Sequence, residues 1–230
     1  MDLTPERILA NLREVRNRIA AAAARSGRTA DAVRLVAVTK TVEPDVIRLL
    51  VGAGQADVGE NRPQQLRDRA RLLADLPMRW HMIGSLQRNK VKYVAAACAM
   101  IHSVDRLDLA EEISRRAQAA NVRAACLVEV NSGEEQKAGV APPEAPALAR
   151  AVAALPGVRL AGLMTMAPIA DDPEAVRPVF AALRQLLERI NRDGGLPRPL
   201  TELSMGMTQD YQAAVEEGAT IVRVGTALFR

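Results

Sequence analysis

The feature that most limits how this chain can fold is a succession of eight short apolar runs, each followed by a longer, more polar stretch. The runs cover residues 34–40, 56–61, 79–85, 99–104, 125–132, 158–166, 201–207 and 220–226. Short runs that are apolar on both faces are typical of strands in a covered parallel sheet. No Asn-Gly turn separates them, so we expect parallel strands joined by crossover connections rather than hairpins.

The stretches between the runs carry helix signals. Predicted helices begin at Pro44, at Pro63, after Asp105, after Pro143 and at Pro173, where Asp172 is the expected N-cap. Residues 4–24 form a further amphipathic pattern ahead of the first strand, with Ile8, Leu12, Val15 and Ile19 on one face. We therefore expect one extra helix at the N-terminus.

Eight strand–helix units in 230 residues fit an α/β fold, a single (β/α)8 TIM-type barrel with an extra N-terminal helix. A doubly wound open sheet is the alternative, but the chain has no Gly-x-Gly-x-x-Gly turn to support it. No linker or low-complexity segment interrupts the pattern. Residues 1–230 are predicted to form one barrel domain.

Composition and charge argue against several functional classes. The net charge is only +4 and aromatic residues make up 2% of the chain, so stacking platforms for nucleic acid are not expected. The N-terminus is charged throughout and no long apolar stretch is present, which predicts a cytoplasmic protein without membrane contact. Two cysteines and two histidines at unrelated spacings predict no metal site.

Lysine is rare in this chain. Of 31 basic residues only Lys40, Lys90, Lys92 and Lys137 are lysines. Arginine stays protonated, whereas a lysine withdrawn from water can lose its proton and attack a carbonyl carbon. Lys40 follows the first apolar run, at the end of a strand where barrels of this kind build their sites. An ordinary strand-end lysine reaching solvent is the alternative, but the scarcity of lysine favours a Schiff base with an aldehyde.

The turns after the seventh and eighth runs indicate an anion site. Ser204 and Gly206 follow one strand, with Thr208 expected to cap the next helix, and Gly225-Thr226 follows the other. Glycines allow close backbone approach, and free N–H groups bind phosphate; barrels often place phosphate at these two loops. A phosphate site and an amine at one barrel mouth suit a ligand carrying phosphate and aldehyde, such as pyridoxal 5′-phosphate (PLP).

Several motifs occur in an order that resembles the pyridoxal-phosphate homeostasis protein family. They are LVAVTK at 35–40, GEN at 59–61, HMIG at 81–84, LQRNK at 86–90, GLM at 162–164, LSMGM at 203–207 and VRVGT at 222–226. The resemblance runs from about Arg7 to the C-terminus. It implies a single-domain barrel similar to the N-terminal domain of alanine racemase.

The resemblance also implies a ligand and the residues that bind it. Lys40 corresponds to the lysine that forms the Schiff base with PLP. The other implied cofactor-binding residues are Ser204, Gly206, Gly225 and Thr226 at the phosphate, Arg223 near the ring or phosphate, and Asn61, His81 and Met205 along the pocket. The implied function is PLP homeostasis, through buffering or delivery of the cofactor to PLP-dependent apoenzymes as transient partners.

Three questions stay open from the sequence. A small PLP-dependent amino-acid racemase of the alanine racemase type is the alternative function, but racemisation needs a second proton-moving group. Tyr93 and Tyr211 are both predicted in helices, so no robust catalysis is expected. The lack of an appended domain favours a monomeric carrier. A third possible function is a module that binds a phosphorylated sugar at the same two turns and forms no Schiff base with Lys40. Lys90 and Lys137 lie in motifs that the family shares, and either could accept the aldehyde during transfer.

Overall fold

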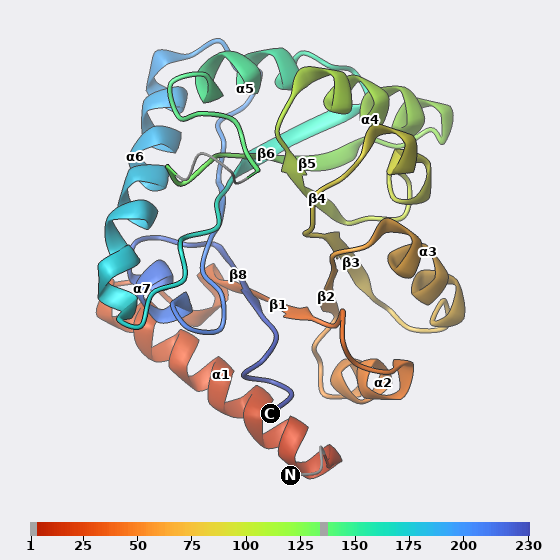
Figure 1. The fold of residues 1–230 in the computed structure, drawn as a ribbon, viewed down its shortest axis with the longest axis vertical. Coiled ribbons are helices and arrows are strands. Elements are labelled where there is room, and N and C mark those ends of the chain that lie inside the picture. Colours follow the sequence, from red (N-terminus) through yellow and green to blue (C-terminus); the bar gives the residue numbers. More distant parts are fainter. Residues whose placement is uncertain (1–3, 134–137) are drawn as a thin grey trace.

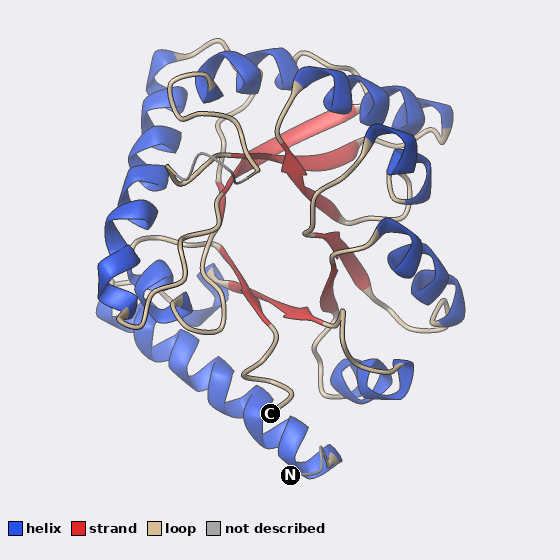
Figure 2. Ribbon diagram, in the orientation of Figure 1, coloured by secondary structure: helices blue, strands red, loops and turns tan. Residues whose placement is uncertain are grey.

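The computed structural model describes residues 4–133 and 138–230, in which eight parallel strands close into a barrel in sequence order. The strands are β1 (Arg34–Val38), β2 (Asp57–Glu60), β3 (Arg79–Met82), β4 (Met100–Val104), β5 (Ala124–Glu129), β6 (Val158–Met164), β7 (Glu202–Ser204) and β8 (Ile221–Val224). Figure 2 shows them as a closed ring inside the helices. The predicted (β/α)8 barrel is confirmed; a single domain over residues 1–230 stays a prediction.

Helices cover the outside of the barrel (Figure 1). The α-helices are α1 (Pro5–Arg25), α2 (Pro44–Gly52), α3 (Pro63–Leu72), α4 (Leu107–Ala119), α5 (Ala145–Ala153), α6 (Arg177–Asp193) and α7 (Tyr211–Glu216), and the 3-10 helices are η1 (Ala30–Ala32), η2 (Arg88–Tyr93) and η3 (Pro173–Val176). Only a 3-10 helix, η2, joins β3 to β4. The extra N-terminal helix is present as α1, which packs against α2 and α7.

Two helix starts differ from the sequence prediction. Asp172 does accept a hydrogen bond from the Glu174 N–H, at 2.9 Å, but it caps η3, and α6 begins only after it. The hydroxyl of Thr208 does not cap α7. It accepts a hydrogen bond from the Gly225 N–H at 3.3 Å. The helix starts after Asp210, whose carboxylate accepts the Met207 N–H of the preceding turn at 2.6 Å and makes no cap hydrogen bond to the helix.

The buried residues form two layers. The outer layer, between barrel and helices, is apolar and includes Leu12, Ile47, Leu109 and Phe180. The inner layer, inside the barrel, has a much smaller apolar cluster: Val36, Met100, Ala125, Leu127, Ala161, Met164 and Ile221. Buried polar side chains occupy much of the remaining interior, among them Asp57, His81, His102, Glu129, Ser204 and Arg223.

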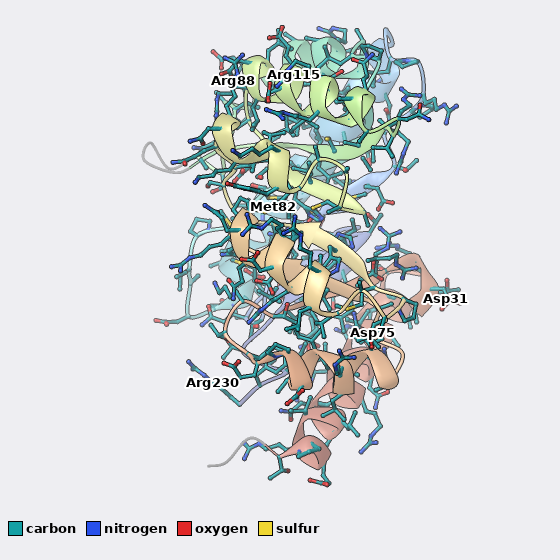
Figure 3. The ribbon with its side chains drawn as sticks, turned by 90° about the vertical axis from the view of Figure 1, so that its right-hand side faces the viewer. Asp31, Asp75, Met82, Arg88, Arg115 and Arg230 are labelled. Atoms are coloured by element: carbon teal, nitrogen blue, oxygen red, sulfur yellow. The ribbon has the colours of Figure 1, made fainter. Side chains whose placement is uncertain are left out.

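The two ends of the barrel are separated in Figure 3, which views the molecule from the side of α2, α3 and η2. Arg88 and Arg230 are labelled on the side where the carboxyl ends of the strands open, and this end is called the mouth below. Asp31 and Asp75 are labelled at the opposite, amino-terminal end. Among the described residues, no helix is both long and apolar enough to span a membrane.

Candidate functional site

Lys40 lies at the mouth of the barrel, just beyond the end of β1. Because side chains alternate along a strand, it shares a face with Val36, which packs inside the barrel. Lys40 lines a groove of about 1000 Å³ between the β1–α2 loop and α3, together with Asn61, Arg62 and Gln65. Its side chain is exposed, so the withdrawal from water expected from the sequence is not seen.

A buried ion pair fixes the backbone beside Lys40. The Arg69 guanidinium donates to the Thr39 carbonyl at 2.7 Å and to Glu60 Oε1 at 2.6 Å. The Thr39 hydroxyl donates to the same Glu60 oxygen at 2.6 Å, and the Gln65 amide donates to the Lys40 carbonyl at 3.1 Å. The backbone at Lys40 is therefore held in place while its side chain stays accessible.

The structure brings the two predicted anion-binding turns together beside Lys40. In the β1–β8 register Ala37 lies opposite Val224, and a Cβ added to Gly225 would lie 3.2 Å from the Val38 Cβ. Both strands therefore end at the same part of the mouth. The hydrogen bond from Gly225 to Thr208 then fastens the turn after β7 to the turn after β8.

These turns have properties that suit a phosphate. Gly206 has φ of 92°, and a Cβ there would lie 2.6 Å from the Ala214 Cβ, so only glycine allows the turn to approach α7 this closely. The N–H groups of Thr226 and Ala227 make no hydrogen bond with any described residue. Free N–H groups in a glycine-containing turn favour a bound anion.

Arg223 extends into the barrel interior. Its guanidinium donates to the Ser204 hydroxyl at 2.6 Å and to the Thr165 carbonyl at 2.9 Å. Burial lowers the pKa of Arg223 to about 10, although Glu129 and Asp210 act in the opposite direction. At neutral pH the side chain is a buried cation held by two oxygen acceptors.

A chain of buried hydrogen bonds continues from Ser204 across the barrel. The Ser204 hydroxyl lies 2.9 Å from His102 Nδ1, His102 Nε2 lies 2.9 Å from His81 Nδ1, and His81 Nε2 lies 2.9 Å from Asp57 Oδ1. The Asp57 carboxylate accepts the last of these hydrogen bonds, from His81 Nε2. Burial, then the nearby His81 and Arg223, lowers the pKa of His102 well below its usual value. The His102 ring is therefore neutral at physiological pH.

The chain ends at the amino-terminal face. There Asp57 pairs with Arg79, whose Nε lies 2.8 Å from Oδ1. Burial raises the pKa of Asp57, but hydrogen bonds from His81 and Arg79 outweigh it and lower the pKa to about 2. These three residues line a cavity of about 170 Å³ together with Arg34, Arg159 and Glu202. His81 itself lies beside Gly59 in the strand register, and its side chain reaches from there into this amino-terminal cavity.

The other predicted site residues divide between mouth and core. Asn61 lies in the Lys40 groove. The Met205 side chain packs in the outer layer, because it alternates with the inward-facing Ser204, so only its backbone reaches the turn. Lys90 is half-buried on η2, and Lys137 lies outside the described residues. No group of histidine, cysteine, aspartate and glutamate side chains that could hold a metal is found in the described ranges.

The sequence analysis missed several polar residues inside the barrel. Glu129 ends β5, and burial together with nearby Asp105 raises its pKa to about 7, with Arg223 acting in the opposite direction. Asp57 and His102 belong to the hydrogen-bond chain. Each is a polar residue at an inward position of an otherwise apolar strand, and this signal was available from the alternation of side chains.

Fold and site together define a class of protein: a (β/α)8 barrel with an amine at the end of β1 and a fastened pair of glycine-containing turns after β7 and β8. The family model for the N-terminal domain of alanine racemase matches residues 6–230. The pyridoxal phosphate homeostasis protein of Aquifex aeolicus is 45% identical over 219 residues, which cover 95% of each chain. This chain belongs to the family of pyridoxal phosphate homeostasis proteins.

Solved structures agree with this assignment. A protein of unknown function from Bifidobacterium adolescentis is 40% identical, with a TM-score of 0.91 over 98% of this chain and 95% of that one. PipY of Synechococcus elongatus, in a structure described as having PLP bound, is 33% identical, with a TM-score of 0.84 over 97% of this chain and all of PipY. The fold of this chain is therefore similar to that of PipY along the full length of PipY.

Proposed function

We propose that this protein binds PLP through a Schiff base with Lys40 and buffers or delivers the cofactor in the cell. The observation that carries the proposal is the position of Lys40, the described lysine that lies at the barrel mouth beside the Gly225-Thr226 turn. The relative from Aquifex aeolicus named for PLP homeostasis and the PLP-bound PipY support it.

The residues at the mouth have complementary roles in this proposal. Gly206, Gly225 and Thr226 hold the phosphate through the backbone of the fastened turns, and Ser204 supports them from inside the barrel. The bound cofactor supplies an aldehyde: the neutral Lys40 amine adds to its carbon, and one water leaves. Because Lys40 is exposed, water can reverse the bond, which suits a protein that releases its ligand.

Asn61 and Arg223 complete the proposed site. Asn61 borders the Lys40 groove, and Gly84 packs against its backbone, since a Cβ there would lie 2.4 Å from the Asn61 carbonyl oxygen. Arg223 contributes a buried positive charge below the mouth, held by Ser204. His81 and Met205 are now proposed to act indirectly, His81 through the hydrogen-bond chain and Met205 through the backbone of its turn.

No robust catalysis is proposed. Racemisation needs proton-moving groups on both faces of the substrate and exclusion of water. Tyr211 is buried in the outer layer and Tyr93 lies on η2, so neither described tyrosine supplies the second group at the mouth. We expect alanine racemisation by the purified protein to stay at background. Robust turnover that Lys40→Ala abolishes would contradict this.

The visible absorption spectrum tests PLP binding. The purified protein, incubated with PLP, should show a yellow Schiff-base band that Lys40→Ala lacks, and borohydride reduction followed by peptide mapping should place the adduct on Lys40. Lys90→Ala is the matched control and should keep the band. A wild-type protein that stays colourless with added PLP would leave a phosphate-binding barrel and refute the proposal.

The proposal also covers the cellular location, the oligomeric state and the partners of the protein. We expect a cytoplasmic monomer that meets PLP-dependent apoenzymes transiently. Sedimentation velocity of the PLP-loaded protein checks the monomer, with a mass near 24.8 kDa as the expected result and a dimer as the contradicting one.

A further inference from the structure

Positive charge is concentrated in one segment of the chain. Residues 62–92 contain eight arginines and lysines and two aspartates, a net charge of +6, whereas the whole chain carries +4. All other residues together therefore sum to −2. The segment forms α3, β3 and η2, and Figure 3 looks onto this side of the molecule.

Most of these cations lack an acidic partner. Arg69, Arg67 and Arg79 are paired with Glu60, Asp68 and Asp57. Five others make no ion pair with any described residue: Arg62, Arg71, Arg88, Lys90 and Lys92. These five, with Arg67, are called the basic face below. On the other side of the barrel, by contrast, Arg177 is paired with Glu174 and Glu216.

Three charges of the basic face gather around one ring. Arg67, Lys92 and Lys90 lie 4.7, 5.2 and 5.9 Å from the centre of the Tyr93 ring. The ring attracts each of them, but the three cations repel one another. A hollow of about 620 Å³ beside the ring is lined by Arg67, Arg71 and Lys92. A negatively charged partner would relieve this repulsion.

The basic face continues into the Lys40 groove. α3 forms one wall of that groove, where Arg62 and Leu72 line it with Lys40. Leu72 is 59% exposed, so the wall offers an apolar contact next to the unpaired cations. A molecule that takes up the ligand of Lys40 from this side meets Leu72 and the basic face together.

We infer that the basic face docks an acidic surface of a PLP-requiring apoenzyme while cofactor moves from Lys40 to it. This inference rests on the proposed function. Charge complementarity favours an acidic partner, and the groove brings that partner next to Lys40. A nucleic acid fits less well, because single strands bind on open aromatic rings, and the described ring here, Tyr93, is already surrounded by cations.

Transfer kinetics test the inference. PLP-loaded protein is mixed with the apo form of an aspartate aminotransferase chosen for a net negative charge, and recovery of aminotransferase activity is followed. Docking predicts a rate that rises with acceptor concentration and exceeds the rate of PLP release, measured separately with alkaline phosphatase to destroy free PLP. Raising ionic strength from about 0.02 to 0.3 M should slow transfer about tenfold. A rate equal to that of release, at every acceptor concentration, would overturn the inference.

Charge reversal locates the surface. Arg71→Glu combined with Lys92→Glu should slow transfer about tenfold and leave the absorption spectrum unchanged. Arg13→Glu with Arg198→Glu makes the same change of net charge at exposed residues elsewhere and should stay within about twofold of wild type. Equal slowing of transfer by both double variants would show that net charge, and not the basic face, sets the rate, and would refute the inference.

Direct binding separates this inference from the proposed function. Anisotropy of labelled apoenzyme with PLP-free protein should report an interaction that the Arg71→Glu, Lys92→Glu pair weakens, whether or not the Lys40 spectrum behaves as proposed. A labelled 20-nucleotide RNA represents the alternative kind of partner, a nucleic acid. Tighter binding of this RNA than of the apoenzyme, lost in the same variant, would reassign the face to nucleic acid and overturn the inference.

Discussion

The inside of the barrel and the layer around it are built from different chemistry. The outer layer is a continuous apolar core in which Phe180, Ile47 and Leu109 are fully buried. The inside is crossed by a hydrogen-bond chain from Arg223 to Asp57. Apolar packing supplies most of the folding free energy, whereas buried polar groups are tolerated only when they are bonded. The difference separates the part that keeps the chain folded from the part that shapes the site.

The outer layer should be the more sensitive to truncation. Phe180→Ala leaves a cavity between α6 and the barrel and should lower the free energy of unfolding by about 4 kcal/mol. Chemical denaturation measures this, and Leu72→Ala, at an exposed position, should cost less than about 0.5 kcal/mol. A loss below about 1 kcal/mol for Phe180→Ala would show that the outer layer is not the main source of stability.

Inside the barrel, Glu129 should make stability depend on pH. Its pKa is raised by burial to about 7, so ionising it costs folding energy, and stability falls as pH rises from about 4.5 through 7. The fall attributable to this group is about 3 kcal/mol. Glu129→Gln should therefore be stabilised relative to wild type at pH 8 and not at pH 5. Parallel stability curves for the two proteins would contradict this.

Asp57 should make stability depend on pH in the opposite direction, with stability lost as the pH falls. His81 and Arg79 outweigh the burial penalty and hold its pKa at about 2, so its contribution is complete above about pH 4 and is lost as pH falls toward 2. The contribution is about 2 kcal/mol. Asp57→Asn should lower stability by that amount at pH 7, and the difference should shrink in acid. A difference that is constant from pH 7 to 3 would exclude the ionised pair as its cause.

The smallest expected effect distinguishes two buried serines. Ser204 joins Arg223 to His102, so Ser204→Ala removes one hydrogen-bond partner from each of these two buried side chains and should cost about 1–2 kcal/mol. Ser103 is equally buried, but its hydroxyl has no partner within the described part of the chain, so Ser103→Ala should be neutral or slightly stabilising. Thermal unfolding of the two variants provides the comparison, and equal losses would argue against the chain.

The sequence predicted the barrel better than its interior. All eight strands lie at the apolar runs, because a strand buried on both faces must be apolar along its length. The Thr208 cap was wrong because the Thr208 hydroxyl instead bonds to the Gly225 N–H, and α7 begins only after Asp210. The role of His81 at the pocket stays a prediction, because a motif does not give the depth of a side chain along a strand, and its ring bonds to Asp57 and His102. Alternation along the strands could have shown that Glu129 and Asp57 face inward, but their partners could not be predicted, because Arg79 meets Asp57 through the pairing of β2 with β3, and Arg223 comes near Glu129 only in the closed barrel.

The position of α1 has a consequence for how the protein is made. α1 packs beside α7, and Asn11 donates hydrogen bonds to the carbonyls of Leu228 and Arg230, 217 and 219 residues away. Figure 1 shows α1 beside the C-terminal residues. During synthesis α1 must therefore wait for β8 and the residues after it before these contacts can form. Until β8 emerges, the edges of β1 and β7 stay unpaired and depend on protection from aggregation.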